Sequence, residues 1–256
     1  IRPAKRLLGQ SIAALAVIIF GNIYITSLQI SILGISLHLG YWGIPFTVVA
    51  VVGIINAFNM IDGINGLCAG LALVAIGALQ FASGFNVSNY SLVIAMGSII
   101  GFLFYNLGFL GNKRRVFLGD NGSTFLGFFV AWTCINYSQG ESSLIMPVTC
   151  LWVVAIPLLD CIRVIAHRIM QGVLPFDAGR DHIHHKLQAY LGSSIKTLIC
   201  LCGMAIFLAS IGVIIEKTTQ SSEISLLIFL GLAACYYIAS NYIDSNKLKN
   251  NTAADV

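Results

Sequence analysis

Residues 196–215 read KTLICLCGMAIFLASIGVII, an apolar segment whose one charged residue stands at its first position. A helix that crosses the hydrocarbon core of a bilayer needs about 20 mostly apolar residues, and this segment meets that requirement. Over all 256 residues 57% are hydrophobic and only 9% are charged, against about a quarter charged in soluble domains. Such a chain cannot cover its surface for water, so the sequence predicts an integral membrane protein and excludes a soluble binding module.

Other apolar blocks of similar length run through the rest of the chain. They predict an all-α fold, a single transmembrane domain over residues 1–256 with about eight spanning helices. The stretch Gln29–Tyr41 alternates weakly between polar and apolar residues, which is compatible with a short re-entrant segment or a surface hairpin. The predicted spans are Leu7–Ser27, Gly43–Ile61, Leu67–Phe85, Tyr90–Leu110, Gly122–Tyr137, Leu144–Ala166, Lys196–Ile215 and Ile224–Ile243.

The lysines and arginines separate when these blocks are threaded alternately through a bilayer. Of the 14 Lys and Arg residues, only Lys217 falls on the side opposite to the two chain ends. The cytoplasmic side of membrane proteins is enriched in Lys and Arg. The pattern therefore predicts that both chain ends are cytoplasmic, and it explains the net charge of +4 without a nucleic-acid partner.

Most acids and histidines fall on the same side as the lysines and arginines. Ionisable groups beside hydrocarbon are costly and usually functional. A transporter would place some of them near the middle of the bilayer, on broken helices. Their position at helix ends on one side favours an enzyme that works at the membrane surface. The residues are Asp62, Asp120, Asp160, Asp177, Asp181, His167, His182, His184 and His185.

The first polar motif, Asn56–Leu67, reads NAFNMIDGINGL, where one span ends and the next begins. Asn56 and Asn59 are three residues apart and share a helix face. Gly63 and Gly66 permit a tight turn and a close approach of the backbone to a ligand. Helix capping is the alternative explanation, but a cap does not need four amide or acid groups on one turn. We therefore favour a binding role for this motif.

The second motif, residues 115–124, reads RVFLGDNGST and follows Lys113 and Arg114. These two basic residues are best explained as membrane anchors on the positive side. Asp120 differs from them, because it is an acid beside a glycine, directly before an apolar span. Mg²⁺ or Mn²⁺ binds one or two such carboxylates together with substrate phosphates. Asp120 is therefore a candidate metal ligand, and it can also cap the helix that starts near Ser123.

The third motif, residues 175–185, reads PFDAGRDHIHH and lies in the longest loop predicted on the cytoplasmic side. An arginine and three histidines within six residues suit a phosphate or diphosphate, because guanidinium and imidazolium groups donate charged hydrogen bonds. Zinc is the rival for such a tract, but no cysteine lies nearby and the basic residues would repel a second cation. Solvated loop histidines are the remaining explanation. His38 and His167 are isolated, and we assign them no role.

Together these motifs resemble those of the polyprenyl-phosphate N-acetylhexosamine-1-phosphate transferases, the glycosyltransferase 4 family. Four segments carry the likeness, and they occur in the order of the family, each at or near the predicted cytoplasmic side. The resemblance covers nearly the whole chain, and the HIHH sequence favours the N-acetylglucosamine branch over the muramoyl-pentapeptide branch. The segments are Asn56–Leu67, Val116–Ser123, Ala155–Asp160 and Arg180–His185.

The resemblance implies transfer of a sugar 1-phosphate from a UDP-sugar to undecaprenyl phosphate in the bacterial inner membrane, with release of UMP. It is the first membrane step in the synthesis of a lipid-linked glycan. The likeness implies catalytic roles for Asp62, Asp120 and His182, with Asp120 and Asn65 as ligands of Mg²⁺ or Mn²⁺. The substrate-binding residues that it implies are Arg180, His184 and His185 at the donor's phosphates or sugar, and Asn56 and Asn59 lining or bracing the nucleotide pocket.

This chain departs from the family pattern at two places. Bacterial members often carry Asp where this chain has Asn65; an amide oxygen can still ligate Mg²⁺, so the change weakens only a role as a base. The family also has an acidic pair in a cytoplasmic loop just before the segment that matches Ile1, whereas no acid precedes Asp62 here. We therefore expect N-terminal spans and that pair to be missing from this chain, and the 256 residues alone to be inactive.

Two alternatives stay open on the sequence alone. A transferase that uses another UDP-N-acetylhexosamine, or UDP-muramoyl-pentapeptide, would share these motifs, because sugar selectivity depends on the shape of the pocket. A membrane transporter or channel is the rival from another class, and Mg²⁺-dependent release of UMP would separate it from the enzyme. The sequence carries no signal for the oligomeric state.

Overall fold

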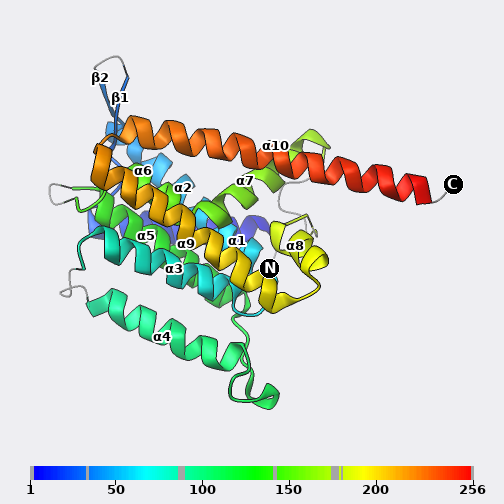
Figure 1. The fold of residues 1–256 in the computed structure, drawn as a ribbon. Coiled ribbons are helices and arrows are strands. Elements are labelled where there is room, and N and C mark those ends of the chain that lie inside the picture. Colours follow the sequence, from blue (N-terminus) through cyan, green and yellow to red (C-terminus); the bar gives the residue numbers. More distant parts are fainter. Residues whose placement is uncertain are drawn as a thin grey trace.

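The computed structural model describes residues 3–32, 35–85, 90–140, 143–173, 179 and 181–254 (Figure 1). These residues form a helix bundle with one antiparallel hairpin, β1 (Ser27–Ile32) and β2 (Ile35–His38). Two short 3-10 helices, η1 (Gly40–Trp42) and η2 (Asn112–Arg114), lie in connections. The α-helices are α1 (Pro3–Gly21), α2 (Gly43–Ile61), α3 (Leu67–Ala82), α4 (Tyr90–Asn106), α5 (Gly119–Ser138), α6 (Pro147–Val153), α7 (Ala155–Met170), α8 (Ile183–Leu191), α9 (Ser194–Thr219) and α10 (Ser222–Ala254).

The turn between α2 and α3 is made by polar residues and glycines within an otherwise apolar segment. Asp62 follows the last residue of α2 with φ −75° and ψ 52°, outside the helical region. Gly66 then takes φ +81°, a left-handed conformation that residues with a Cβ rarely adopt, and α3 begins at the next residue. The polar groups of the first motif are thereby gathered at the tip of one helix pair.

The centre of the helix packing is α3, and the main apolar cluster extends from it to α2, α5, α6, α7 and α9. Where α2 meets α5, a Cβ on Gly127 would lie 2.8 Å from the Cα of Ile55, so the two backbones are in close contact. Small residues that permit such an approach are typical of helix packing in membranes. This packing fixes the end of α2 against the start of α5, and those two helix ends carry Asp62 and Asp120.

The helices run between two ends of the molecule, which Figure 1 shows on opposite sides of the view. The start of α1, α8, the connection between α4 and α5, and the last turns of α10 lie at one end. We call this end the motif end, because the described parts of the three polar motifs reach it. The hairpin and the first turn of α10 lie at the other end. Loops that the sequence predicts on one side of a membrane therefore share one end of the bundle.

The helical membrane character agrees with the prediction, but the number of spans does not. The predicted block Leu144–Ala166 is a broken helix, because α6 and α7 are bent by 82° at Val154. These two helices count together as one span at most. In addition, α3 and α4 contain 16 and 17 residues, fewer than the about 20 that a span requires. Within the described ranges, the helices long and apolar enough to cross a bilayer are four, or five with the bent pair: Ala4–Gly21, Gly40–Ile61, Ser194–Thr219 and Ser222–Ser240.

The hairpin is the exception to the all-α prediction. It runs from Ser27 to His38 and so begins two residues before Gln29–Tyr41, the stretch for which a hairpin was one of the two expected structures. The buried side chain of Gln139 holds its base: Oε1 accepts from the backbone N–H of Thr26 at 3.0 Å, and Nε2 donates to the carbonyl of Ser27 at 3.1 Å. A weakly alternating sequence is thus anchored by an amide from the end of α5, far along the chain.

Candidate active site

Asp62 and Asp120 come from different motifs and lie close enough to interact electrostatically. Asp62 is half-buried at the end of α2, whereas Asp120 is exposed in the first turn of α5. Burial, and then the negative charge of Asp120, raise the pKa of Asp62 from 3.8 to about 6. A carboxyl group whose ionisation is disfavoured by burial and by a nearby acid marks a place where a cation would be stabilising.

Asn59 connects these two helix ends directly. Its Nδ2 donates to Oγ of Ser123 at 2.9 Å, and Ser123 is buried in the first turn of α5. Ser123 Oγ in turn lies 3.3 Å from the carbonyl oxygens of both Gly119 and Asp120. The first motif therefore supports the backbone that carries Asp120.

The two asparagines of the first motif are also bonded to α1. Arg6 donates from one guanidinium nitrogen to Oδ1 of Asn59 at 2.9 Å and from the other to Oδ1 of Asn56 at 3.3 Å. Asn56 is buried and donates to Oε1 of Gln10 at 2.8 Å. These contacts hold both asparagines in place, and their role in lining or bracing a nucleotide pocket stays a prediction. Sequence reasoning had treated Arg6 as an orientation signal; its position in the first turns of an apolar helix was the only hint of this role.

The histidine motif packs against the turn that carries Asp62. A Cβ on Gly63 would lie 2.0 Å from Nε2 of His184, so the ring of His184 rests on the bare backbone of Gly63. Gly63 was predicted to permit close approach by a ligand; the structure shows that it admits a histidine ring. The rings of His182 and His185 lie 5.8 and 4.1 Å from that of His184, measured between centroids.

His184 differs electrostatically from what the sequence predicted. Its side chain is buried, and neither ring nitrogen has a hydrogen-bond partner among the described residues. Burial, followed by the charges of His185 and His182, lowers the pKa of His184 from 6.5 to about 4. The ring is therefore neutral at pH 7, so it can donate or accept a hydrogen bond but does not add the positive charge expected of an imidazolium.

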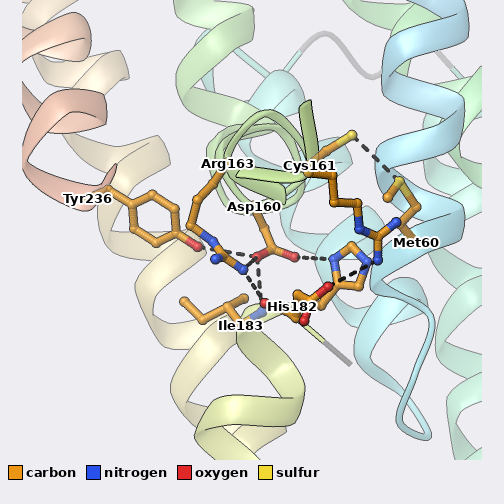
Figure 2. A network of polar contacts seen from close by, with 9 residues as sticks. Met60, Asp160, Cys161, Arg163, His182, Ile183 and Tyr236 are labelled. Carbon is orange, nitrogen blue, oxygen red and sulfur yellow. Dashed lines mark hydrogen bonds and ion pairs between the residues drawn. The ribbon is translucent and has the colours of Figure 1, made fainter. Parts of the chain in front are cut away.

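A buried acid outside the three motifs joins the site, as Figure 2 shows. Asp160 lies in the middle of α7 and accepts from Nδ1 of His182 at 2.8 Å and from the backbone N–H of Ile183 at 2.9 Å. Arg163 and the hydroxyl of Tyr236 approach the same carboxylate at 3.4 Å each. The sequence placed Asp160 among the acids near the cytoplasmic side and in the family segment Ala155–Asp160, but it assigned Asp160 no specific role in the site.

The stretch between α7 and α8 is held by two arginines of α7. Arg163 donates to the carbonyl of Asp181, and Arg168 pairs with the carboxylate of Asp181 at 3.3 Å. Two predicted positions of this loop, Asp177 and the substrate-binding candidate Arg180, lie outside the described residues. The part of the third motif that the structure describes therefore rests on α7 as well as on the α2–α3 turn.

The donor set suits a hard cation only in part. Asn65 is half-buried in the same turn as Asp62, and its side chain offers an amide oxygen. In the described part of the chain no three Asp, Glu, His or Cys side chains converge on one point. Mg²⁺ commonly takes one or two protein carboxylates and completes its shell with water and substrate phosphates. The residues therefore fit Mg²⁺ or Mn²⁺ bound together with a diphosphate rather than in a closed protein cage.

Comparison with known proteins assigns the family. Residues 1–138, more than half of the chain, match the glycosyl transferase family 4 model. The chain belongs to glycosyl transferase family 4. The matched part of this family 4 protein includes Asp62, Asn65 and Asp120, so the resemblance inferred from the motifs is confirmed at the level of the family.

Curated relatives extend the likeness beyond residue 138. Proteins named undecaprenyl-phosphate alpha-N-acetylglucosaminyl 1-phosphate transferase match at 37% identity in Escherichia coli O157:H7 and in Yersinia pestis, each over 89% of this chain and 63% of the relative. The protein of that name from Haemophilus influenzae is 38% identical over 84% of this chain and 62% of its own length. The chain thus spans somewhat less than two thirds of these relatives.

Proposed function

We propose that this protein transfers N-acetylglucosamine 1-phosphate from UDP-N-acetylglucosamine to undecaprenyl phosphate and releases UMP. Its membership in glycosyl transferase family 4 supports a transferase. The relatives at 37% identity are named undecaprenyl-phosphate alpha-N-acetylglucosaminyl 1-phosphate transferase, which supports this donor and this acceptor. The protein would then catalyse a first membrane step in the synthesis of a lipid-linked glycan.

One observation carries the proposal: the polar motifs, far apart in sequence, meet at the motif end. Asp120 acts on the pKa of Asp62, and the ring of His184 rests on Gly63 beside Asp62. A nucleotide sugar that reached this place would meet carboxylates on one side and imidazoles on the other. Motifs that only capped helices or lay in solvent would have no reason to converge.

Charge repulsion is the main obstacle to the proposed reaction. The donor diphosphate carries about two negative charges, and the acceptor phosphate adds nearly two more because its second pKa is about 6. The reaction is therefore governed by positioning and charge neutralisation. Arg180 and the histidines would bind the donor's phosphates, and neutral His184 would contribute a hydrogen bond rather than a charge.

We infer a direct displacement. An oxygen of the acceptor phosphate attacks the β-phosphorus of the donor, and the bond from that phosphorus to the bridging oxygen breaks. The electron pair and the bridging oxygen leave with UMP. Asp62 would orient the acceptor phosphate or take its remaining proton, and a pKa near 6 suits either task near neutral pH.

A divalent cation is part of the proposal. When bound, Mg²⁺ or Mn²⁺ would offset negative charge on the donor diphosphate. Asp120 and Asn65 would hold it, since Asn65 lies in the same turn as Asp62 and the charge of Asp120 acts on Asp62. The exposure of Asp120 leaves it accessible to a cation that arrives with the substrate.

The proposed location is the bacterial inner membrane, with the motif end and both chain ends in the cytoplasm. The excess of lysine and arginine on that side supports this orientation. UDP-sugars would then reach the site from the cytosol, while the acceptor's hydrocarbon tail stays in the bilayer between helices. Oligomeric state is not part of the proposal.

Because the 256 residues alone are expected to be inactive, the proposal is tested with the complete gene product that contains this chain, purified into nanodiscs and given radiolabelled UDP-N-acetylglucosamine. Labelled lipid and free UMP should form only when undecaprenyl phosphate and Mg²⁺ are both present, and Asp120→Asn should abolish both. UDP-N-acetylgalactosamine and UDP-muramoyl-pentapeptide serve as competing donors. Release of UMP from one of these alone would replace the proposed donor, and no release from any donor by the folded protein would refute a transferase.

The direct displacement is tested with donor labelled at the β-phosphate. Incubation without the acceptor should leave the protein unlabelled. A labelled protein, with the label lost in Asp62→Asn, would favour the competing route through a covalent aspartyl phosphate.

A further inference from the structure

We propose that Asp160 positions His182 for the transfer reaction by fixing which ring nitrogen of His182 faces the substrate. This inference rests on the proposed function. Asp160 belongs to none of the three polar motifs and is only 1% exposed, in the middle of α7. Both of its carboxylate oxygens are already bonded to other groups of the protein, so we place its role in the reaction through another residue.

The shortest bonds of Asp160 lead to the beginning of α8. Oδ2 accepts from Nδ1 of His182 at 2.8 Å, and Oδ1 accepts from the N–H of Ile183 at 2.9 Å (Figure 2). One carboxylate thus holds both the ring of His182 and the backbone of the next residue. These two hydrogen bonds restrain the position of the His182 ring and the backbone at the start of α8.

The chemistry of the carboxylate then sets the tautomer of the ring. A carboxylate can only accept hydrogen bonds, so Nδ1 of His182 must carry the proton. Nε2 is left as the nitrogen that can accept from, or when protonated donate to, a substrate group. Partners of this kind commonly fix histidine orientation, and their loss typically costs about 10- to 100-fold in function where they have been tested around metal ligands.

The position of the His182 ring affects the surroundings of Asp62 through the ring of His184. The rings of His182 and His184 are nearly parallel, at 11° and 5.8 Å between centroids. The ring of His184 in turn rests on Gly63, next to Asp62. A rotated His182 would therefore disturb the imidazole cluster that borders the carboxylate side of the site.

A purely structural ion pair with Arg163 is the competing explanation. Arg163 follows Asp160 by one helix turn, but its nearest nitrogen is 3.4 Å from Oδ1, whereas His182 is 2.8 Å from Oδ2. The carboxylate is thus hydrogen-bonded most closely to the histidine. The two explanations differ in what they predict for the protonation of the His182 ring.

The test uses ring-nitrogen NMR of protein labelled with ¹⁵N-histidine, with His182→Gln to assign the His182 signals. In the unmodified protein above pH 8, Nδ1 should be the protonated nitrogen and Nε2 the unprotonated one. In Asp160→Asn, the new amide N–H faces Nδ1, so the proton should move to Nε2. We expect kcat for transfer to fall by about 10- to 100-fold in this variant.

Cys161→Ala is the matched control, because Cys161 is the next residue of α7, is also buried, and packs on Met60. It should keep the tautomer and kcat of the unmodified protein. The proposal is overturned if Nδ1 of His182 is unprotonated in the unmodified protein. This NMR measurement can be made even if the Asp160→Asn variant does not fold. It is also overturned if Asp160→Asn inverts the tautomer and kcat is unchanged. Absence of transfer by the complete gene product that contains this chain would instead refute the proposed function, whereas the NMR result on His182 does not depend on turnover.

Discussion

At the residue scale, Gly63 is the point where the first and third motifs touch. A methyl group there would overlap the ring of His184, because a Cβ would lie 2.0 Å from Nε2. We predict that Gly63→Ala displaces His184, destabilises the protein by about 1–3 kcal/mol, and lowers transfer by about 100-fold through misplacement of the site. Thermal unfolding in detergent and the UMP-release assay measure the two effects.

Gly97→Ala is the control for that substitution. Gly97 lies within α4, and a Cβ added there would meet no atom within 4 Å. Alanine is the better helix former, so this variant should be neutral or slightly stabilising, with activity unchanged. Equal losses of stability and activity in Gly63→Ala and Gly97→Ala would contradict the prediction, because they could not be attributed to the contact with His184.

The buried ring of His184 predicts a loss of stability in acid. The unfolded chain takes up a proton on this ring below about pH 6.5, while burial keeps the folded ring neutral down to about pH 4. Its contribution is therefore complete above the unfolded pKa and is lost as the pH falls between these values, by up to about 3 kcal/mol. His184→Gln should flatten the pH dependence of the unfolding temperature in that window; an unchanged slope would contradict the assignment.

At the scale of the elements, α1, α2 and α5 are tied together by polar contacts at the motif end. Arg6 of α1 binds Asn56 and Asn59 of α2, and Asn59 binds Ser123 at the start of α5. Hydrogen bonds between membrane helices are individually modest, at about 0.6–2 kcal/mol. Their value here is geometric, since the last of them supports the turn that carries Asp120.

We predict that the fork of Arg6 cannot be replaced by a lysine. A single ammonium keeps the charge but does not reproduce the planar pair of donors that reach both asparagines. Arg6→Lys should therefore cost about 1 kcal/mol of stability and should lower transfer activity, with Arg6→Ala more severe. Lys5→Ala is the control, because Lys5 is the exposed neighbour on the same helix. Wild-type activity in Arg6→Lys would reduce Arg6 to an orientation signal.

At the scale of the whole molecule, the separation of lysine and arginine toward one end predicts the orientation in the membrane. Single cysteines at Arg114, in η2, and at Leu37, in β2, would report on the two ends in a protein stripped of its native cysteines; both positions are exposed. In inverted inner-membrane vesicles a membrane-impermeant maleimide should label position 114 and spare position 37, and spheroplasts should give the opposite result. Labelling of position 37 from the cytoplasmic side would reverse the proposed topology.

The sequence was a good guide to the helices and a poorer guide to how they cross a bilayer. Each predicted apolar block contains a helix, because apolar composition and length act locally. The sequence did not predict the bend of 82° at Val154 or the short lengths of α3 and α4. Hydropathy averaged over a block does not show where a helix ends or breaks. The sequence left the hairpin as one of two possible structures for a related reason: its base is held by Gln139, which lies far along the chain.

By itself the sequence determined the membrane class, the side on which the polar residues collect, and the family, because each follows from composition or from short motifs read in order. Only the tertiary structure decided which side chains meet: Asp62 with Asp120, Gly63 with His184, and Asp160 with His182. The physical reason is that such pairs join helices through packing and through hydrogen bonds whose partners are distant in sequence. No local pattern records those contacts, so the sequence could place Asp160 in a family segment but could not show which histidine it holds.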